Sequence, residues 1–586
     1  MKVLQRRYLL RNEKGKTVET PSRLFRRVAH AIASVEIKYD KKNNVKNIEK
    51  QFYNALSKLE FLPNTPTLMN AGTKIGQLSA CFVIPVGDSL PEIFDAAKWT
   101  AIIHQSGGGT GFDFSRLRPK GDVVESTGGA ASGPVAFMTI FDKITDVIKQ
   151  GGSRRGANMG ILRVDHPDIL EFIACKSNEN FLNNFNISVT VTDEFMNSVE
   201  KNSEYRLINP RNNQTSSKLN AKEVFDLIVI NAWKTGDPGI IFIDEINRAN
   251  PTPKIGEIEA TNPCGEQPLL AWESCNLGSI NLSKVVKGKT IDWNKLGRLV
   301  RLGVRFLDDV IDANKYPVRE IKAITQANRK IGIGVMGFAD ALIKMNIPYN
   351  SRKAVKIGER IMRFIEKEGH KSSLQLGKER GNFPNFENSV WKTKKKYQCM
   401  RNATVTTVAP TGTISIIAGC SSGIEPLFAI SFVRNVMEGT RLFETNSTFE
   451  QTAKKAKFFS QERLMQISKT GSIQKIPGIP KNVKNIFVTA LDISAEWHIK
   501  MQAGFQKYTD NAVSKTINLP ENATPEEVGD AYMTAYKLKC KGITVYRYES
   551  KPQQVLAFGS EEKGLEKHVV ADSEFAGGCE GIVCPH

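Results

Sequence analysis

The sequence predicts an α/β fold, because short apolar runs of strand type alternate with longer stretches of helical periodicity. Three of the apolar runs, at residues 80–85, 239–243 and 485–489, are interpreted as buried strands. Residues 351–376, between the last two runs, repeat apolar side chains at the spacing of a helix. Alternation of this kind is typical of sheets that are covered by helices.

Both ends of the chain differ from this α/β body. Near the start, Thr20-Pro21 is a helix-start signal, and apolar residues follow at helical spacing. After Tyr548 the periodic pattern ends. We therefore predict a helical segment over residues 1–60, an α/β body over residues 61–550 and a flexible tail over residues 551–586.

The composition is that of an ordinary globular protein, with 586 residues, 40% hydrophobic and 24% charged. No apolar run approaches the roughly 18 residues that span a bilayer, and the first residues do not resemble a signal peptide. We expect a soluble, cytoplasmic protein without a membrane partner. The net charge of +20 favours polyanionic ligands such as nucleotides, although the lysines are spread along the whole chain.

Residues 260–269 form the most informative stretch. They place Asn262, Cys264 and Glu266 at alternating positions, so an extended backbone would point an amide, a thiol and a carboxylate the same way. The chain has nine cysteines, an odd and scattered set that does not make a secreted disulfide framework. In a reducing compartment, catalytic, redox or metal-binding roles are therefore favoured for the cysteines.

Two further thiols lie close to the C-terminus. Cys579 and Cys584 follow a pair of glycines in the predicted tail, an arrangement that suits thiol–disulfide exchange. The rival interpretation is a zinc site that uses both thiols and His586, but a closed site needs a fourth ligand and none is near in the sequence.

Three segments are candidates for anion binding. The glycines of residues 107–111 could let backbone amides approach an anion, although the segment is neither a dinucleotide fingerprint nor a P-loop. Residues 409–415 combine small and hydroxyl side chains in a second candidate phosphate cradle. The loop 151–158 carries Arg154 and Arg155, whose guanidinium groups suit phosphates or base edges.

Taken together, these stretches resemble the catalytic chain of ribonucleotide reductases, specifically that of the adenosylcobalamin-dependent (class II) enzymes. The likeness runs from about residue 5 to the C-terminus and includes residues 63–70, 78–81, 104–121, 150–160, 262–269, 274–282, 409–415, 508–515 and the two-cysteine tail. The resemblance implies a ten-stranded α/β barrel of two five-stranded parallel halves. A finger loop would carry a radical cysteine into the centre of this barrel.

The resemblance also assigns catalytic roles. Cys264 would be the thiyl residue, Glu266 the base on the substrate 3′-hydroxyl, and Asn262 would hold the ribose. The chemistry is consistent, because abstraction of the 3′-hydrogen makes loss of the 2′-hydroxyl feasible and a carboxylate can manage the proton. A cofactor must generate the thiyl radical, and the resemblance implies adenosylcobalamin.

The electrons would come from thiols. By resemblance, Cys81 and Cys275 are oxidised to a disulfide as the 2′-hydroxyl leaves as water. Cys579 and Cys584 would reduce this disulfide again, and a thioredoxin- or glutaredoxin-like donor would reduce the tail.

Substrate and effector positions follow from the same resemblance. The substrate contacts would be Thr65, Ala80, Cys81, Gly109, Asn262, Pro263, Cys264, Gly265 and Glu266, with the phosphates on Pro410, Thr411, Gly412, Thr413 and Ile414. A deoxynucleoside triphosphate effector would contact Asp88, Ser89, Leu90 and Arg118. The loop with Arg154 and Arg155 would transmit to the substrate base which effector is bound. By the same resemblance, the substrate would be a ribonucleoside di- or triphosphate; a homodimer is plausible, and nucleic acid is not expected as a partner.

Two features refine the class. The N-terminal part is too short for an ATP-cone domain, so we expect no overall control by ATP and dATP. Arg547 separates Tyr546 from Tyr548, whereas chains that work with a metal-radical subunit carry two adjacent tyrosines in this region. The alternative is a class I-like catalytic subunit with such a partner. We expect structural roles for the remaining cysteines and for two histidines, namely Cys175, Cys399, Cys420, Cys540, His104 and His166.

Overall fold

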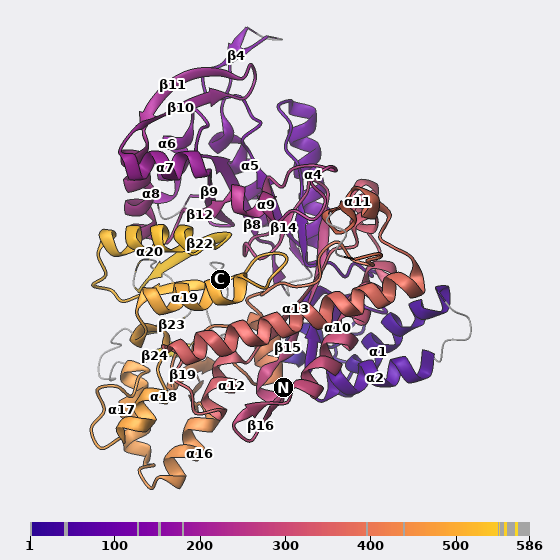
Figure 1. The fold of residues 1–586 in the computed structure, drawn as a ribbon, viewed down its shortest axis with the longest axis vertical. Coiled ribbons are helices and arrows are strands. Elements are labelled where there is room, and N and C mark those ends of the chain that lie inside the picture. The colour runs from indigo at the N-terminus through magenta and orange to yellow at the C-terminus, as the bar shows by residue number, and fades with distance from the viewer. Residues whose placement is uncertain are drawn as a thin grey trace.

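The computed structural model describes residues 3–39, 45–125, 128–150, 154–178, 181–393, 397–436, 440–548 and 550, together with two short strands at 556–558 and 569–571. A helical N-terminal part lies against a barrel of strands, and two smaller lobes extend from the barrel (Figure 1). No helix among these residues has the length and apolar character needed to cross a membrane.

The N-terminal part is helical, as the sequence indicates. It consists of a π-helical turn η1 (Leu4–Tyr8), α1 (Pro21–Ala33), the 3-10 helix η2 (Ser34–Lys38) and α2 (Val45–Ser57). The side chain of Thr20 accepts a hydrogen bond from the amide of Arg23 and so caps α1. The buried face of α1 joins the same apolar core as the barrel strands β15 and β18.

Five parallel strands form the first half of the barrel. They pair in the order β2 (Cys81–Val83), β3 (Gly109–Asp113), β8 (Asn158–Arg163), β9 (Phe185–Val191) and β12 (Gly239–Phe242). The strands predicted at 80–85 and 239–243 are therefore present as β2 and β12.

The second half consists of β15 (Ser274–Asn281), β18 (Ile331–Met336), residues 406–408, β21 (Thr516–Leu519) and β22 (Gly542–Arg547). Two isolated parallel bridges, Ile333 to Thr406 and Val408 to Val513, link β18 through residues 406–408 to the segment before β21. Antiparallel pairing of β15 with β2 and of β12 with β22 joins the halves. The ring is therefore closed, and the predicted barrel of two five-stranded parallel halves is confirmed.

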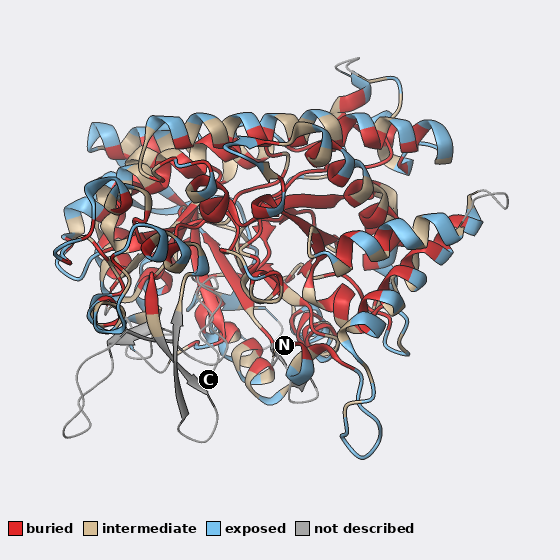
Figure 2. Cartoon of the chain, turned by 90° about the horizontal axis from the view of Figure 1, so that it is seen from below, coloured by how far each residue is buried: buried red, intermediate tan, exposed pale blue. Residues whose placement is uncertain are grey.

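Helices cover the barrel, so buried residues gather in its middle and exposed residues on the outer helices (Figure 2). The long helices α10 and α13 flank the second half, whereas α4 and α5 pack together beside the first. The helices of the body are α3 (Thr65–Asn70), α4 (Leu90–Gln105), α5 (Pro134–Val147), α9 (Ile243–Arg248), α10 (Trp293–Ala313), α11 (Arg319–Asn328), α12 (Phe338–Lys344), α13 (Arg352–Arg380), α14 (Val390–Thr393), α15 (Gly412–Ala418), α19 (Ala495–Gln506) and α20 (Pro525–Lys537). A short strand β1 (Phe61–Pro63) pairs antiparallel with β15.

The two lobes lie at opposite ends of the molecule (Figure 1). One contains the hairpin β10 (Glu204–Asn209) and β11 (Gln214–Asn220) with α6 (Ile169–Ala174), α7 (Asp193–Lys201) and α8 (Ala221–Thr235). The other contains α16 (Ser447–Lys455), α17 (Gln461–Thr470) and α18 (Lys481–Ile486), which share a separate apolar cluster.

The prediction of a strand at residues 485–489 is wrong. The first two residues of this run, 485 and 486, end α18, which begins after Pro480, and of the remaining three only Thr489 makes an isolated bridge. Val483, Ile486 and Phe487 recur at helical spacing and pack on the apolar cluster of their lobe. A short apolar run cannot by itself distinguish a strand from a short buried helix.

A hairpin of β13 (Ala260–Thr261) and β14 (Pro268–Leu269) enters the barrel, and we call residues 260–269 the finger. Its backbone accepts hydrogen bonds from both halves of the barrel. The carbonyl of Glu266 accepts a 3.0 Å hydrogen bond from the amide of Ala512, and the carbonyl of Pro263 accepts one of 2.8 Å from Asn186 in β9. The finger also crosses β3 so closely that a Cβ atom on Gly111 would lie 1.7 Å from the carbonyl oxygen of Thr261.

The glycines of residues 107–111 therefore serve packing. The amides of residues 107–110 all donate hydrogen bonds to backbone carbonyls, so they are not directed at an anion. The anion-cradle hypothesis for this segment is wrong, because the end of α4 and the neighbouring strands use the amides, and the finger occupies the space beside Gly109 and Gly111.

Gly111→Ala should displace the finger. We expect a loss of about 1–3 kcal/mol of stability, measured as a lower melting temperature, together with a loss of whatever activity the finger supports. Gly256→Ala is the matched control, because a Cβ atom there meets only ordinary contact at 3.6 Å. Equal behaviour of the two variants would contradict the close crossing.

Candidate active site

A tight turn places Cys264 at the tip of the finger. The amide of Gly265 donates to the carbonyl of Asn262 at 3.0 Å, and the amide of Asn262 donates to the carbonyl of Gln267 at 3.2 Å. Gly265 has φ +76°, a conformation that favours glycine. The three side chains of the predicted constellation therefore come together through a turn rather than through an extended backbone.

Asn262 holds the constellation together. Its side-chain nitrogen donates to the Glu266 carboxylate at 2.8 Å and to the Cys81 sulfur at 3.2 Å. Its side-chain oxygen accepts the amide of Gln267 at 2.9 Å. One amide group therefore fixes the carboxylate of the finger relative to a thiol of the barrel wall.

Cys81 and Cys275 face each other across the seam between the two halves. They are paired residues in the antiparallel register of β2 and β15, and both are buried. Paired antiparallel residues have Cα atoms about 4.5–5.5 Å apart, which lies within the range that a disulfide bridges. Burial raises the pKa of the Cys275 thiol, and the nearby Lys330 ammonium, which forms an ion pair with Glu273, opposes this rise.

The carboxyl group of Glu266 has a pKa near neutrality. Its side chain is only 2% exposed, and this burial raises its pKa to about 7, whereas the hydrogen bond from Asn262 lowers it. A carboxyl group with such a pKa can accept and return a proton at physiological pH.

A cleft of about 220 Å³ is bordered by Cys81, Asn262, Cys264 and Glu266, whereas Cys275 is not among its lining residues. It is lined by the residues that the resemblance assigned to the substrate, with one exception: Thr65, Ala80, Cys81, Gly109, Asn262, Pro263, Cys264, Glu266, Pro410, Thr411, Gly412, Thr413 and Ile414. The exception is Gly265, which faces a different cavity. Nine further lining residues were not assigned to the substrate: Asn64, Pro66, Gly108, Ala157, Leu277, Gly278, Ser279 and Ala409 lie within the stretches that carry the resemblance, whereas Arg7 belongs to none of them.

A second cavity lies on the other side of Cys264. It is lined by parts of β9, β12, β21 and β22 and by Gly265, Gln502, Lys515 and Lys541. The side-chain oxygen of Gln502 is buried there without a hydrogen-bond partner. Cys264 borders both cavities, so its sulfur can serve a group on either side of the finger.

Comparison with known proteins identifies the family. Residues 79–546 match the family described as "Ribonucleotide reductase, barrel domain", and residues 1–76 match "Ribonucleotide reductase, all-alpha domain". The chain belongs to the ribonucleotide reductase family. The family prediction made from the sequence is therefore confirmed.

Named relatives resemble this reductase over most of its length. It is 53% identical to the vitamin B12-dependent ribonucleoside-diphosphate reductase of Thermoplasma acidophilum, over 97% of this chain and 81% of the relative. A protein of the same name from Mycobacterium tuberculosis is 47% identical over 99% of this chain and 81% of the relative. Among solved structures, the Actinobacillus ureae class Id ribonucleotide reductase alpha subunit has the same fold, with a TM-score of 0.75 and 24% identity over 93% of this chain and 96% of that one.

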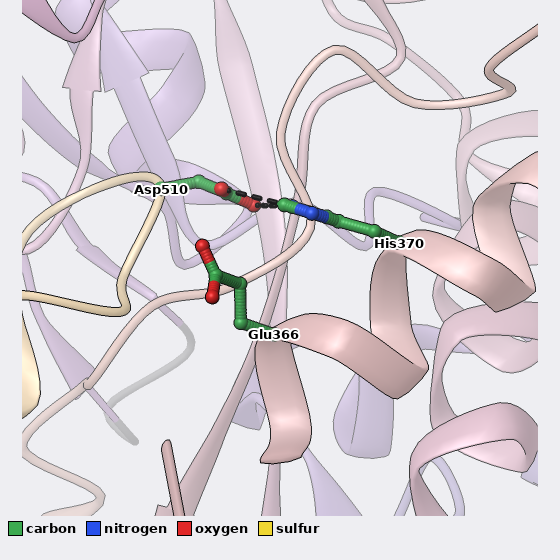
Figure 3. A group of neighbouring side chains, drawn as sticks. All are labelled: Glu366, His370 and Asp510. Atoms are coloured by element: carbon green, nitrogen blue, oxygen red, sulfur yellow. Dashed lines mark hydrogen bonds and ion pairs between the residues drawn. The ribbon is translucent and has the colours of Figure 1, made fainter. Parts of the chain in front are cut away.

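An ion pair outside the cleft supports the finger of the reductase. Asp510 accepts hydrogen bonds of 2.8 and 3.1 Å from the amides of Val405 and Thr406, and His370 of α13 lies 3.0 Å from both of its carboxylate oxygens. Figure 3 shows Asp510 facing His370, with Glu366 one turn away on the same helix. The segment after Asp510 carries Ala512, whose amide binds the finger.

The same three side chains could also attract a metal ion, because their ligand atoms lie within 4.8 Å of one another. The hydrogen bonds oppose this interpretation. Both carboxylate oxygens of Asp510 already face the Nε2 atom of His370, so a metal ion would have to break that contact. We therefore interpret the pair as structural.

Other predicted residues lie away from the cleft. Asp88 and Arg118 form a 2.8 Å ion pair beside the N-terminus of α4, where Ser89 is the N-cap and Leu90 begins the helix. His104 and His166 are buried and hydrogen-bonded, consistent with structural roles. The side chains of Arg154 and Arg155, and residues Cys579, Cys584 and His586, lie outside the described residues.

Asp510→Asn should loosen the finger without touching the substrate. The pKa of Asp510 is lowered to about 2, because His370 and the two amides outweigh the effect of burial. Its stabilising effect is therefore present above the ordinary carboxyl pKa and is lost as the pH falls toward about 2.

At neutral pH we expect the variant to lose about 3–5 kcal/mol of stability, read as a lower melting temperature, and to show a lower kcat at little-changed KM. Asp226→Asn is the control, because Asp226 forms only an exposed pair with Lys222. A variant as stable and active as this control would refute the supporting role.

Proposed function

We propose that this chain is an adenosylcobalamin-dependent ribonucleotide reductase that converts ribonucleoside diphosphates into 2′-deoxyribonucleoside diphosphates. The observation that carries the proposal is the position of Cys264 between two cavities, with Asn262, Glu266 and Cys81 lining one of them and Cys275 opposite Cys81 in the strand register. The relatives at 47–53% identity are named vitamin B12-dependent ribonucleoside-diphosphate reductases, which favours this cofactor and this substrate.

The substrate would bind with its ribose beside Cys264 and its phosphates toward residues 410–414. Asn262 would orient the ribose, since its amide already lies between Glu266 and Cys81. Residues 412–414 form the first turn of α15 and line the cleft. The first amides of a helix lack intrahelical acceptors and face outward along its axis, so they suit a phosphate group.

Each group has one task in the reaction. The Cys264 thiyl radical abstracts the 3′-hydrogen, and Glu266 takes the proton of the 3′-hydroxyl. A thiol of the Cys81/Cys275 pair donates a proton to the departing 2′-hydroxyl, which leaves as water. The two thiols together supply two electrons and two protons as their disulfide forms: one proton leaves in the water, and the other proton with one electron becomes the new hydrogen on the 2′-carbon. The second electron and the proton held by Glu266 reduce the 3′-carbonyl, and Cys264 then returns the hydrogen atom to the 3′-carbon.

The second cavity would hold the reactive part of the cofactor. Gln502, with its unpartnered side-chain oxygen, and the buried Lys541 are polar groups that fit a ligand rich in hydrogen-bonding groups. Adenosylcobalamin, when bound, supplies the one-electron chemistry that side chains do not provide unaided. Pro263 and Gly265 flank Cys264 and separate the two cavities.

Regulation and re-reduction complete the proposal. Cys579 and Cys584 would reduce the Cys81–Cys275 disulfide, with a thioredoxin- or glutaredoxin-like protein as donor. A deoxynucleoside triphosphate would bind near Asp88 and Arg118.

Large apolar side chains on α4 and α5 support a homodimer through these helices: Leu90, Phe94 and Val147 are 59%, 54% and 67% exposed.

The deciding experiment uses the full chain alone. Incubated with adenosylcobalamin, a dithiol and a ribonucleoside diphosphate, it should form the deoxyribonucleotide. Cys264→Ser should abolish the product, whereas Cys399→Ser should retain it, because Cys399 lines neither cavity and its thiol donates to the carbonyl of Leu374. Turnover that requires a metal-radical partner protein would instead establish the class I-like alternative.

The pH dependence should report Glu266. The base form exists above its pKa of about 7, so kcat/KM should rise with pH through an inflection near that value. Asn262→Ala removes the hydrogen bond that lowers this pKa and should move the inflection to higher pH in the residual activity. Glu266→Gln should remove both the activity and the inflection. A wild-type profile without an inflection near neutrality would contradict the role of Glu266 as base.

A further inference from the structure

We infer that Arg7, in the N-terminal turn η1, binds the phosphate groups of the nucleotide substrate and makes the N-terminal segment part of the active site. The inference rests on the placement of the substrate in the cleft proposed above. It concerns a residue that lies 257 positions before Cys264 in the sequence and that no local motif connects with the finger.

The fold holds Arg7 at the cleft. Arg7 lines the same cleft as Cys264 and residues 409–414. On either side of it, Leu4 and Tyr8 are buried in the main core, with exposed fractions of 8% and 2%. The Tyr8 hydroxyl also forms a 2.8 Å hydrogen bond with the hydroxyl of Thr65, another residue of the cleft. The backbone at Arg7 is therefore fixed relative to the cleft wall.

The charges in the cleft give Arg7 its role. Of the described residues that line the cleft, only Arg7 and Glu266 carry charged side chains. Other buried cations near the finger are directed elsewhere, because Lys515 and Lys541 line the second cavity and Lys330 pairs with Glu273. A diphosphate brings several negative charges into a cleft that already contains a carboxyl group.

The turn at residues 411–414 can only partly balance these charges. A helix terminus contributes roughly half an elementary charge, and its effect falls off within the first turn. An arginine adds a full positive charge and a planar fork of donors that matches phosphate oxygens. Arg7 therefore complements the turn, with each binding the phosphates through a different kind of donor.

This role predicts a specific kinetic change. The phosphates do not react, so their contact with Arg7 is the same in the ground state and the transition state. Loss of such uniform binding raises KM and leaves kcat nearly unchanged. A merely structural role would instead lower the melting temperature and kcat together.

The test compares two neighbouring arginines in the full chain. Arg6 is exposed and does not line the cleft, whereas Arg7 is half-buried, so Arg6→Ala is a matched control for Arg7→Ala. The readouts are KM and kcat for ADP reduction, the dissociation constant of ADP measured calorimetrically, and the melting temperature.

We expect Arg7→Ala to raise KM and the dissociation constant about tenfold to a hundredfold, the loss typical of hydrogen bonds to a charged group, with kcat within about twofold. Arg7→Lys should recover part of the loss, because it restores the charge but not the fork. Arg7→Met keeps the apolar stem, and it replaces Arg7→Ala if that variant is unstable.

The outcomes separate the two proposals. If Arg7→Ala and Arg6→Ala bind and reduce ADP equally well, the inference about Arg7 is overturned while the reductase activity stands. If the wild-type chain neither binds nor reduces ADP, the proposed function itself fails. A lower kcat with unchanged ADP binding would make Arg7 a structural residue and would also overturn the inference.

Discussion

The close crossing of the finger over β3 is the constraint on which the site depends. A hairpin can occupy the middle of a closed barrel only if the walls leave room for its backbone, and Gly111 provides that room beside Thr261. The opposite wall then fixes the hairpin through backbone hydrogen bonds, as Ala512 does at Glu266. Cys264 lies at the tip because a tight turn with Gly265 at positive φ closes the hairpin.

Burial of the finger explains the chemistry of its side chains. Removing a carboxylate from water disfavours its charged form, so Glu266 titrates near neutrality rather than in the usual acidic range. The single side-chain amide of Asn262 offsets part of this effect and at the same time bridges the carboxylate and the Cys81 sulfur. The same exclusion of water would protect a radical from side reactions.

The N-terminal helices are held to the barrel by buried charges. Glu36 of η2 contacts Arg305 of α10 at 2.6 Å and Arg380 of α13 at 2.6 Å. Arg380 in turn pairs with Asp308 and Asp309 at 2.9 and 2.7 Å. Breaking a buried network of this kind is costly, so it fixes the orientation of the N-terminal part. That orientation matters because the segment before these helices carries Arg7 to the cleft.

The sequence by itself determined the α/β class, the helix after Thr20 and, through the ordered motifs, the barrel, the family and most residues of the cleft. These features could be predicted because periodicity and motif spacing are local properties of the chain. Only the tertiary structure decided the antiparallel register that places Cys81 opposite Cys275, which glycines make room for the finger, and that Arg7 reaches the substrate cleft. Such contacts join segments hundreds of positions apart, so their geometry follows from the closure of the barrel and leaves no local pattern in the sequence.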